Sequence, residues 1–421
     1  MIGSRDGRQD ALPAAQLGRL LRVLTAATFL VFFQAFMVAP LIPVLAEIFD
    51  VTPRFMGFIE PAYLIPYGAM VLVWGPLSDR VGRRQVILGS MSAFVALTAL
   101  ATLADSAGGF LGARALIAIG SSGIVPIALA LVGDVFPFER RGHALGWVFG
   151  AMAGGIAVGS SAGALLEPAV GWRGLYLIVS ALGAGVLTVL WRHRRLLGNR
   201  PAAQPRPVRA VARSYLALLR ARRARRTYAY VLFNAVLHAG IYTWLGVYLV
   251  DRYALSEAGI GFALLGYGIP GFLLGPLVGR LADERGRARL IPLGLTVAAI
   301  AAGVLAVSIP VGLAVFAVAL LSLGYDLTQP LLAGIVTDLS PNRGQAMALN
   351  VFTLFMGLGT GSLVFQALLP LGFGTALTIF AAAAVVAALV GLGAFRSELA
   401  PGPATGSVRA PEPAATSGVS T

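Results

Sequence analysis

The chain has 421 residues, of which 57% are hydrophobic and only 12% are charged, about half the charged share of soluble domains. This composition argues against a water-soluble enzyme, a nucleic-acid-binding protein and a disordered chain. The net charge of +14 comes entirely from Arg, because the 32 basic residues include no Lys. With no Cys and three His, neither a disulfide framework nor a dedicated metal centre is expected.

Twelve segments are apolar over the roughly 20 residues that a helix needs to cross a bilayer. None shows the alternating pattern of a membrane β-barrel, so the sequence predicts an all-α polytopic membrane protein. The predicted spans are 23–46, 57–76, 86–104, 109–132, 141–166, 171–191, 227–250, 258–278, 290–307, 311–336, 343–368 and 372–395.

The positions of the Arg residues predict how these spans are oriented. If the N-terminus is inside, 28 of the 32 Arg lie in segments on that side, 3 lie on the other side and Arg114 lies within a span. Basic residues are enriched in cytoplasmic loops. Both termini of this multi-pass protein are therefore predicted to be cytoplasmic, in the cytoplasmic (inner) membrane, and the charge indicates topology and no nucleic-acid partner.

Two sets of six spans are separated by an arginine-rich linker. The predicted segments are an N-terminal tail (1–22), a first bundle (23–191), a linker with 12 Arg (192–226), a second bundle (227–395) and a disordered tail (396–421). Within the linker, the pattern from Ser214 to Arg226 favours a basic amphipathic helix on the inner membrane face.

The two halves repeat each other at an offset of 204 residues, which takes Asp79 to Asp283. The same offset pairs Asp134 with Asp338, Pro137 with Pro341, Tyr63 with Tyr267, Pro66 with Pro270 and Gln34 with His238. A repeat without inversion predicts two similar bundles related by a pseudo-twofold axis normal to the membrane. In transporters of this kind the substrate path lies between the halves, near the bilayer midplane.

The loop after the second span has a distinctive composition. Its notable residues are Gly75, Asp79, Arg80, Gly82, Arg83 and Arg84. This run resembles motif A of the major facilitator superfamily (MFS), and with the twelve spans, the repeat and the basic linker the resemblance covers nearly the whole chain. It implies the MFS fold and transport by alternating access, nearest to the drug:proton antiporter-like branch.

Motif A residues are predicted to form an inner gate. Asp79, the following Arg residues and Asp134 at the end of the fourth span form a cluster that can latch the two bundles together at the cytoplasmic face. In the family, the motif A Asp interacts with the eleventh helix. The second copy consists of Gly279, Asp283, Gly286, Arg287 and Asp338. It has Glu284 where the first copy has Arg80, so we expect the ion pairs of its latch to differ from those of the first.

The fifth span contains closely spaced glycines: Gly150, Gly154, Gly155 and Gly159. Small residues at this spacing let helices pack backbone to backbone. The pattern also resembles motif C of the proton-coupled antiporters, although Gly155 stands in place of its Pro and Val158 in place of one Gly. Both interpretations, generic tight packing and an antiporter motif, remain open at this stage.

Ionisable residues within spans are the candidates for proton coupling, because charges in a bilayer are costly and mark pathways. They are Asp326, Arg114, His238 and Glu60. Asp326, near the middle of the tenth span, is the preferred carrier, since a carboxyl group that alternates between burial and a nearby cation can load and release a proton. Pro330 is expected to break that helix one turn later. Arg114 matches the motif B Arg, which the family links to proton coupling.

Polar and aromatic residues of the first, fourth, seventh and tenth spans are predicted to line the substrate path. The polar and tyrosine candidates are Gln34, Asn234, Tyr242, Tyr325 and Gln329, and the other aromatic candidates are Phe32, Phe33, Phe36 and Trp244. Such a lining suits a moderately apolar organic solute, cationic if the nearby acids take part.

The sequence therefore predicts a secondary transporter, a proton-coupled exporter of small organic or drug-like molecules. The alternatives are a symporter or uptake carrier for a nutrient or organic anion and, more remotely, a membrane-embedded sensor or enzyme. We expect no enzymatic activity and no cofactor, with a proton gradient as the energy source. The expected partners are a small-molecule substrate and membrane lipids, and the protein is expected to be a monomer.

Overall fold

The computed structural model describes residues 13–197, 208–267, 287–340 and 343–398. These residues form helices and short connections, with no strand among them. Ten of the described helices are long and apolar enough to cross a membrane. The predicted all-α polytopic class is confirmed.

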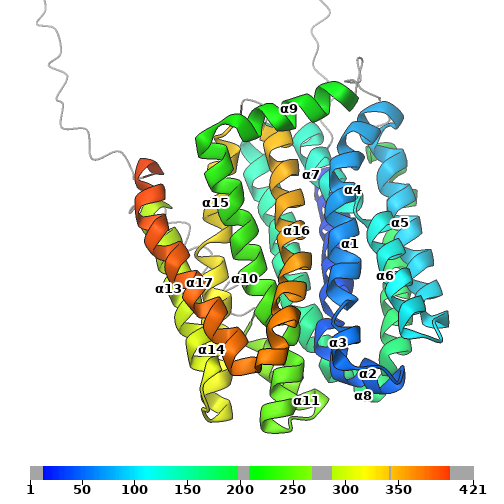
Figure 1. Cartoon of the computed structure of the whole chain (residues 1–421). Coiled ribbons are helices and arrows are strands. Elements are labelled where there is room, and N and C mark those ends of the chain that lie inside the picture. The colour runs from blue at the N-terminus through cyan, green and yellow to red at the C-terminus, as the bar shows by residue number, and fades with distance from the viewer. Residues whose placement is uncertain (1–12, 198–207, 268–286, 341–342, 399–421) are drawn as a thin grey trace, which may run out of the picture.

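The N-terminal half is built from eight α-helices that lie together on one side of the molecule (Figure 1). They are α1 (Ala14–Phe36), α2 (Ile42–Ile48), α3 (Pro53–Met56), α4 (Ile59–Val81), α5 (Arg83–Leu100), α6 (Ala107–Ser121), α7 (Ile124–Val135) and α8 (Phe138–Arg192), with short 3-10 turns η1 (Ala39–Leu41), η2 (Ala101–Leu103) and η3 (Arg194–Leu197). Helix α8 contains the fifth and sixth predicted spans. Gly171, with φ 68°, interrupts its helical geometry between them.

The C-terminal half packs beside it, preceded by a helix of the linker. The helices are α9 (Val208–Arg220) in the linker, then α10 (Arg222–Tyr253), α11 (Glu257–Leu265), α13 (Arg287–Ala306), α14 (Val311–Asp326), α15 (Gln329–Thr337), α16 (Arg343–Leu368) and α17 (Phe373–Ala394), with turns η4 (Leu369–Leu371) and η5 (Arg396–Glu398). The eighth predicted span, 258–278, is described only as far as residue 267.

The linker differs from the sequence prediction. The expected single helix from Ser214 to Arg226 is two helices, because Ala221 has extended backbone geometry (ψ 130°) between α9 and α10. Arg222 to Arg226 therefore form the first turns of α10, before the predicted start of the seventh span at 227. The apolar face of α9 packs through Leu218 and Leu219 against the C-terminal half.

Three predicted spans are broken helices. The first span stops at Phe36, near Pro40 and Pro43, and continues as η1 and α2. The fourth span is split into α6 and α7, and the tenth into α14 and α15. Pro330 lies in the first turn of α15, where its missing N–H costs nothing, so the break comes just before it. Asp326 is thus the last residue of α14 and lies near the middle of the span Val311–Thr337, and the helix breaks directly after it rather than one turn later.

The two halves meet in the middle of the molecule and toward the end that carries α2, α3 and α11, here called the opposite end (Figure 1). A Cβ added to Gly68 of α4 would lie 2.7 Å from Phe355 Cβ of α16. Gly261 of α11 approaches Leu165 of α8 equally closely, with 2.7 Å from its added Cβ to Leu165 Cγ.

The other end carries Arg80, Arg83, Arg84, Arg140 and Arg141 and is here called the arginine-rich end. Gly75 lies on the same face of α4 as Gly68, two turns nearer to this end. No described heavy atom lies within 4 Å of a Cβ added to Gly75. The close contact that α4 makes with α16 at Gly68 is therefore not repeated by any described residue at Gly75.

Candidate functional site

A buried charge pair lies inside the N-terminal half. Arg114 of α6 and Glu60 of α4 are 0% and 1% exposed, and their nearest charged atoms, Arg114 Nη2 and Glu60 Oε1, are 3.8 Å apart. The Arg114 guanidinium also lies over the Tyr63 ring, 4.5 Å from its centroid. The structure thus brings together two of the four predicted proton-coupling residues.

Arg114 also caps the end of the broken first span. It donates to the carbonyl oxygens of Gln34 (3.3 Å) and Ala35 (3.0 Å) in the last turn of α1, and to Ile59 O (3.3 Å) at the start of α4. The last carbonyls of a helix have no partner within that helix. A buried guanidinium, with five donors, satisfies several of them at once.

Asp326 lies in the other half, at the end of α14. Its Oδ2 accepts a hydrogen bond from Ser322 Oγ, one turn earlier, at 3.3 Å. Among the described residues, no Arg or His lies within ion-pair distance of this carboxylate. Unlike Glu60, it has no described cation beside it.

A polar network joins the seventh and tenth spans close to Asp326. Thr328 Oγ1 donates to Asn234 Oδ1 at 2.9 Å, and Asn234 Nδ2 donates to Gln329 Oε1 at 3.2 Å. His238, one turn along from Asn234, is 1% exposed, and neither of its ring nitrogens has a hydrogen-bond partner in the described residues. Its ring lies 5.1 Å from that of Tyr325, centroid to centroid.

Aromatic rings fill the space between the two halves. Phe355 of α16 lies 4.5 Å from Tyr67 and 6.1 Å from Phe32 between ring centroids. Phe36 meets Tyr242 of the seventh span edge to face at 6.1 Å. Gln34 in the adjacent turn is fully buried, with both side-chain polar atoms unpaired among the described residues. The contact between the halves is thus made in part by aromatic rings from α1, α4, α10 and α16.

Two aromatic candidates lie elsewhere. Trp244 is closely packed against Gly57 at the opposite end, and its Nε1 donates to Ser362 O at 3.1 Å. The Phe33 ring lies 5.9 Å from that of Phe29 of its own helix, centroid to centroid, in a tilted arrangement. Trp244 is therefore a contact between the halves at the opposite end.

The motif A residues cluster at the arginine-rich end. Gly82 makes the turn between α4 and α5 with φ 97°, a backbone conformation that a residue with a side chain adopts only under strain. Arg83 forms an ion pair with Asp134 at the end of α7, and its Nη1 lies 3.8 Å from Asp79 Oδ1. These contacts all lie within the N-terminal half, and the Asp79 side chain is 47% exposed. In this conformation the cluster braces one half, whereas the family latch involves the eleventh helix.

Arg80 is exposed on the last turn of α4, and Arg84 lies in the first turn of α5.

The second motif copy is described only in part. Gly279, Asp283 and Gly286 lie outside the described residues, and Arg287 is the first residue of α13. Asp338 follows α15, where Thr337 Oγ1 approaches its Oδ1 at 3.5 Å.

The glycines of the fifth span fall into two groups. A Cβ added to Gly155 would lie 2.7 Å from Phe29 O, and one added to Gly159 would lie 2.6 Å from Phe33 O. Gly150 has no described heavy atom within 4 Å of such a Cβ, and Gly154 has only ordinary contacts. Gly155 and Gly159 thus set the approach of α8 to α1, while Gly150 and Gly154 do not.

Sequence reasoning did not select three residues that complete these clusters. They are Tyr63, over which Arg114 lies, Phe355, which joins the halves, and Thr328, which bridges Asn234 to the tenth span. Tyr63 carried a signal, because the repeat pairs it with Tyr267. Phe355 carried none, since an apolar ring in an apolar span has no distinguishing pattern.

Comparison with known proteins agrees with this architecture. A transporter of Bacillus subtilis described as the uncharacterized MFS-type transporter YwfA is 25% identical over 344 residues, 80% of this chain and 82% of that protein. The chloramphenicol resistance protein of Pseudomonas aeruginosa is 33% identical over 160 residues, 37% of this chain and 38% of that protein.

Solved structures share the fold. The human organic anion transporter MFSD10 (TETRAN) superposes with a TM-score of 0.70 at 20% identity, covering 89% of this chain and 99% of that one. A POT family transporter superposes with a TM-score of 0.71 at 15% identity, over 88% and 94% of the two chains. The sequence model of the Major Facilitator Superfamily matches residues 24–266 and 248–419. With its two helical halves and buried charges, this chain belongs to the Major Facilitator Superfamily of transporters.

Proposed function

We propose that the protein is a secondary active transporter that exports small organic or drug-like compounds in exchange for protons by alternating access. The observation that carries the proposal is Asp326, a carboxylate at a helix break inside the membrane-spanning region with Ser322 as its hydrogen-bond donor. A bare charge in such an interior is costly, so binding a proton there is a step that a transport cycle can use.

The lining between the halves supports a moderately apolar substrate. Phe32, Phe36, Tyr67, Tyr242 and Phe355 offer ring faces and edges. Gln34 on α1 and His238 on α10 carry buried polar atoms without a hydrogen-bond partner in the described part of the chain, and buried polar atoms of this kind gain from a ligand that can hydrogen-bond. Two relatives, named as a chloramphenicol resistance protein and an efflux pump of Dothistroma septosporum, point in the same direction.

The Arg114–Glu60 pair has a different proposed role. Arg114 connects α6 to the end of α1 and the start of α4 through its hydrogen bonds. A change in the charge of Glu60 would alter its interaction with Arg114 and so affect the contacts among these three helices. We assign proton binding to Asp326 and the transmission of conformational change to Arg114 and Glu60, with His238 as a polar group of the path.

Transport in proteoliposomes tests the proposal. Chloramphenicol, ethidium and a panel of organic cations and anions are measured with an imposed pH gradient of either sign. We expect a gradient-driven flux that Asp326→Asn abolishes, while Asp105→Asn, an acid-to-amide change at a side chain that is 97% exposed, leaves it unchanged. A gradient-driven flux that persists in Asp326→Asn excludes Asp326 as the carrier.

The sign of the coupled gradient separates export from uptake. Antiport requires the compound to move against the proton flow, whereas the symport alternative requires both to move together. The incomplete motif C of the fifth span, where Gly155 replaces Pro, is the feature that keeps symport as the second candidate.

A further inference from the structure

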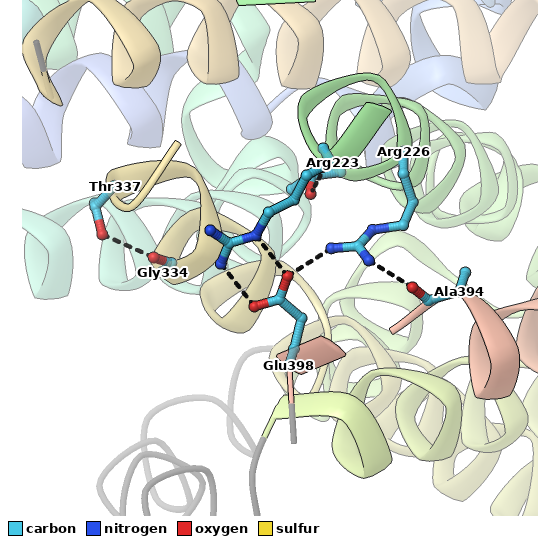
Figure 2. Close-up of polar contacts among 7 residues, drawn as sticks. Arg223, Arg226, Gly334, Thr337, Ala394 and Glu398 are labelled. Carbon is cyan, nitrogen blue, oxygen red and sulfur yellow. Dashed lines mark hydrogen bonds and ion pairs between the residues drawn. The ribbon is translucent and has the colours of Figure 1, made fainter. Parts of the chain in front are cut away.

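An ionic clamp ties the beginning of α10 to the segment just after α17 (Figure 2). Arg223 Nε and Nη2 each donate to one oxygen of Glu398 at 2.8 Å, and Arg226 Nη2 donates to Glu398 Oε1 at 2.6 Å. Arg226 also donates to Ala394 O and lies over the Phe395 ring, 4.5 Å from its centroid. The Glu398 side chain is only 6% exposed, so these charged groups form a partly dry contact in which paired hydrogen bonds are strong.

The clamp joins two helices with different surroundings. At its other end, α10 contacts the N-terminal half: Trp244 packs against Gly57, and a Cβ added to Gly246 would lie 3.1 Å from Pro40 O. Helix α17 packs mainly on α13, and these two form the edge of the molecule farthest from the N-terminal half (Figure 1). Glu398 therefore holds the start of α10 toward that outer edge.

The N-terminal half has no carboxylate at the position equivalent to Glu398. The repeat offset that relates the halves pairs Arg223 with Arg19, Arg226 with Arg22 and Glu398 with Arg194. Arg194 is a cation, and in η3 it donates to Trp191 O at the end of α8 at 3.3 Å. Since a six-helix half forms without a carboxylate at this position, the clamp is a special feature of the C-terminal half.

We propose that Glu398 is a positioning residue that keeps the arginine-rich end open, because it binds Arg223 and Arg226 and so holds the start of α10 away from the N-terminal half. Neutralising Glu398 frees this end of α10, and the balance moves toward closure of the arginine-rich end. The proposal rests on the rocking of the two halves assumed for the transporter, but its test needs no substrate.

A single cysteine reports the opening directly, because the chain has no Cys of its own. Leu72→Cys places a thiol on α4 one turn from Gly68 toward the arginine-rich end, on the face that meets α16 at Gly68. In lipid nanodiscs, where both faces are accessible, its reaction rate with a cationic methanethiosulfonate is measured. We expect Glu398→Gln to slow labelling about fivefold, the low end of typical coupling between sites.

Matched variants separate the clamp from general charge effects. Arg222→Gln with Arg225→Gln removes two exposed cations from the same turns of α10 and is expected to leave the rate unchanged. Arg223→Gln with Arg226→Gln is expected to slow labelling as Glu398→Gln does, and the triple variant to slow it no further, since all three residues act in one contact. Glu398→Asp, which keeps the charge, is expected to restore part of the rate.

A thermal scan of each variant shows whether it is folded. Parent-like labelling in a folded Glu398→Gln protein overturns the proposal, even if its melting temperature falls, because the clamp is then only structural. Equal slowing in the Arg222/Arg225 control also overturns it. If Glu398→Gln does not fold, Arg223→Gln alone is measured, with slower labelling expected and an unchanged rate contradicting the proposal. If the transport proposal is wrong, the labelling rates still decide whether Glu398 keeps the arginine-rich end open.

Discussion

At the residue scale, Arg114 illustrates both what the sequence reveals and what it hides. A charged residue in an apolar span is conspicuous, and so Arg114 and Glu60 were each identified from the sequence. Their pairing, and the bonds from Arg114 to Gln34 O and Ala35 O, were not predictable, because no spacing rule relates side chains on different spans. The same holds for Thr328 and Asn234.

Replacing Arg114 is expected to destabilise the protein more than replacing Glu60. Arg114→Met leaves Glu60 buried without a cation and leaves carbonyls of Gln34, Ala35 and Ile59 unpaired, so we expect a loss of about 3 kcal/mol or more in stability. Glu60→Gln keeps the backbone bonds of Arg114 and is expected to cost less. Thermal unfolding in detergent compares the two, and a larger drop in melting temperature for Glu60→Gln would contradict the capping role of Arg114.

The clamp predicts a pH dependence of stability. Burial acts to raise the pKa of Glu398, but its hydrogen bonds and charge interactions with Arg223 and Arg226 outweigh this, and the pKa lies below its ordinary value of 4.5. A group with a lowered pKa stabilises the fold above its unfolded pKa and loses that contribution as the pH falls through the folded value. The difference in melting temperature between the parent and Glu398→Gln should therefore be constant from pH 8 to about pH 6 and disappear in acid, well below 4.5. A difference that grows as the pH falls from 8 to 6 would contradict this assignment.

At the element scale, hydropathy alone located most of the spans, because a lipid-immersed helix must be apolar over its whole length. Helix breaks were harder to predict. Pro330 indicated the break in the tenth span, but the end of α14 at Asp326 depends on packing. The boundary between α9 and α10 at Ala221 was missed, since a run of Arg and Ala has high helix propensity throughout and conceals the break.

The fifth-span glycines give an element-scale prediction. Gly159→Ala adds a Cβ 2.6 Å from Phe33 O, which forces α8 away from α1 and should lower the melting temperature. Gly150→Ala adds the same group in open space, where Ala favours a helix over Gly by about 0.5–1 kcal/mol, so the melting temperature should be equal or higher. Equal destabilisation by both changes would show that helix contact at Gly159 does not set the packing.

At the scale of the whole molecule, the internal repeat predicted two bundles, and comparison with known families and structures confirms that architecture. Which conformation the halves adopt could not be predicted from the sequence. Alternative conformations of a transporter differ by a few kcal/mol, summed over contacts such as Gly68 with Phe355 that join distant spans. In the structure, α8 and α11 meet at the opposite end, at Leu165 and Gly261, whereas no described heavy atom lies within 4 Å of a Cβ added to Gly75 near the arginine-rich end.

Alternating access requires the opposite end to open in each cycle, and a cross-link there tests this most directly. A Cβ at Gly261 would lie 2.7 Å from Leu165 Cγ, so that the two Cβ atoms lie close enough for a disulfide. The Leu165→Cys/Gly261→Cys protein, otherwise free of Cys, is reconstituted, and pH-gradient-driven flux of chloramphenicol and ethidium is measured before oxidation, after oxidation and after reduction, with each single variant as control. We expect cross-linking to stop the flux and reduction to restore it; flux at the full rate through quantitatively cross-linked protein would contradict alternating access between these halves.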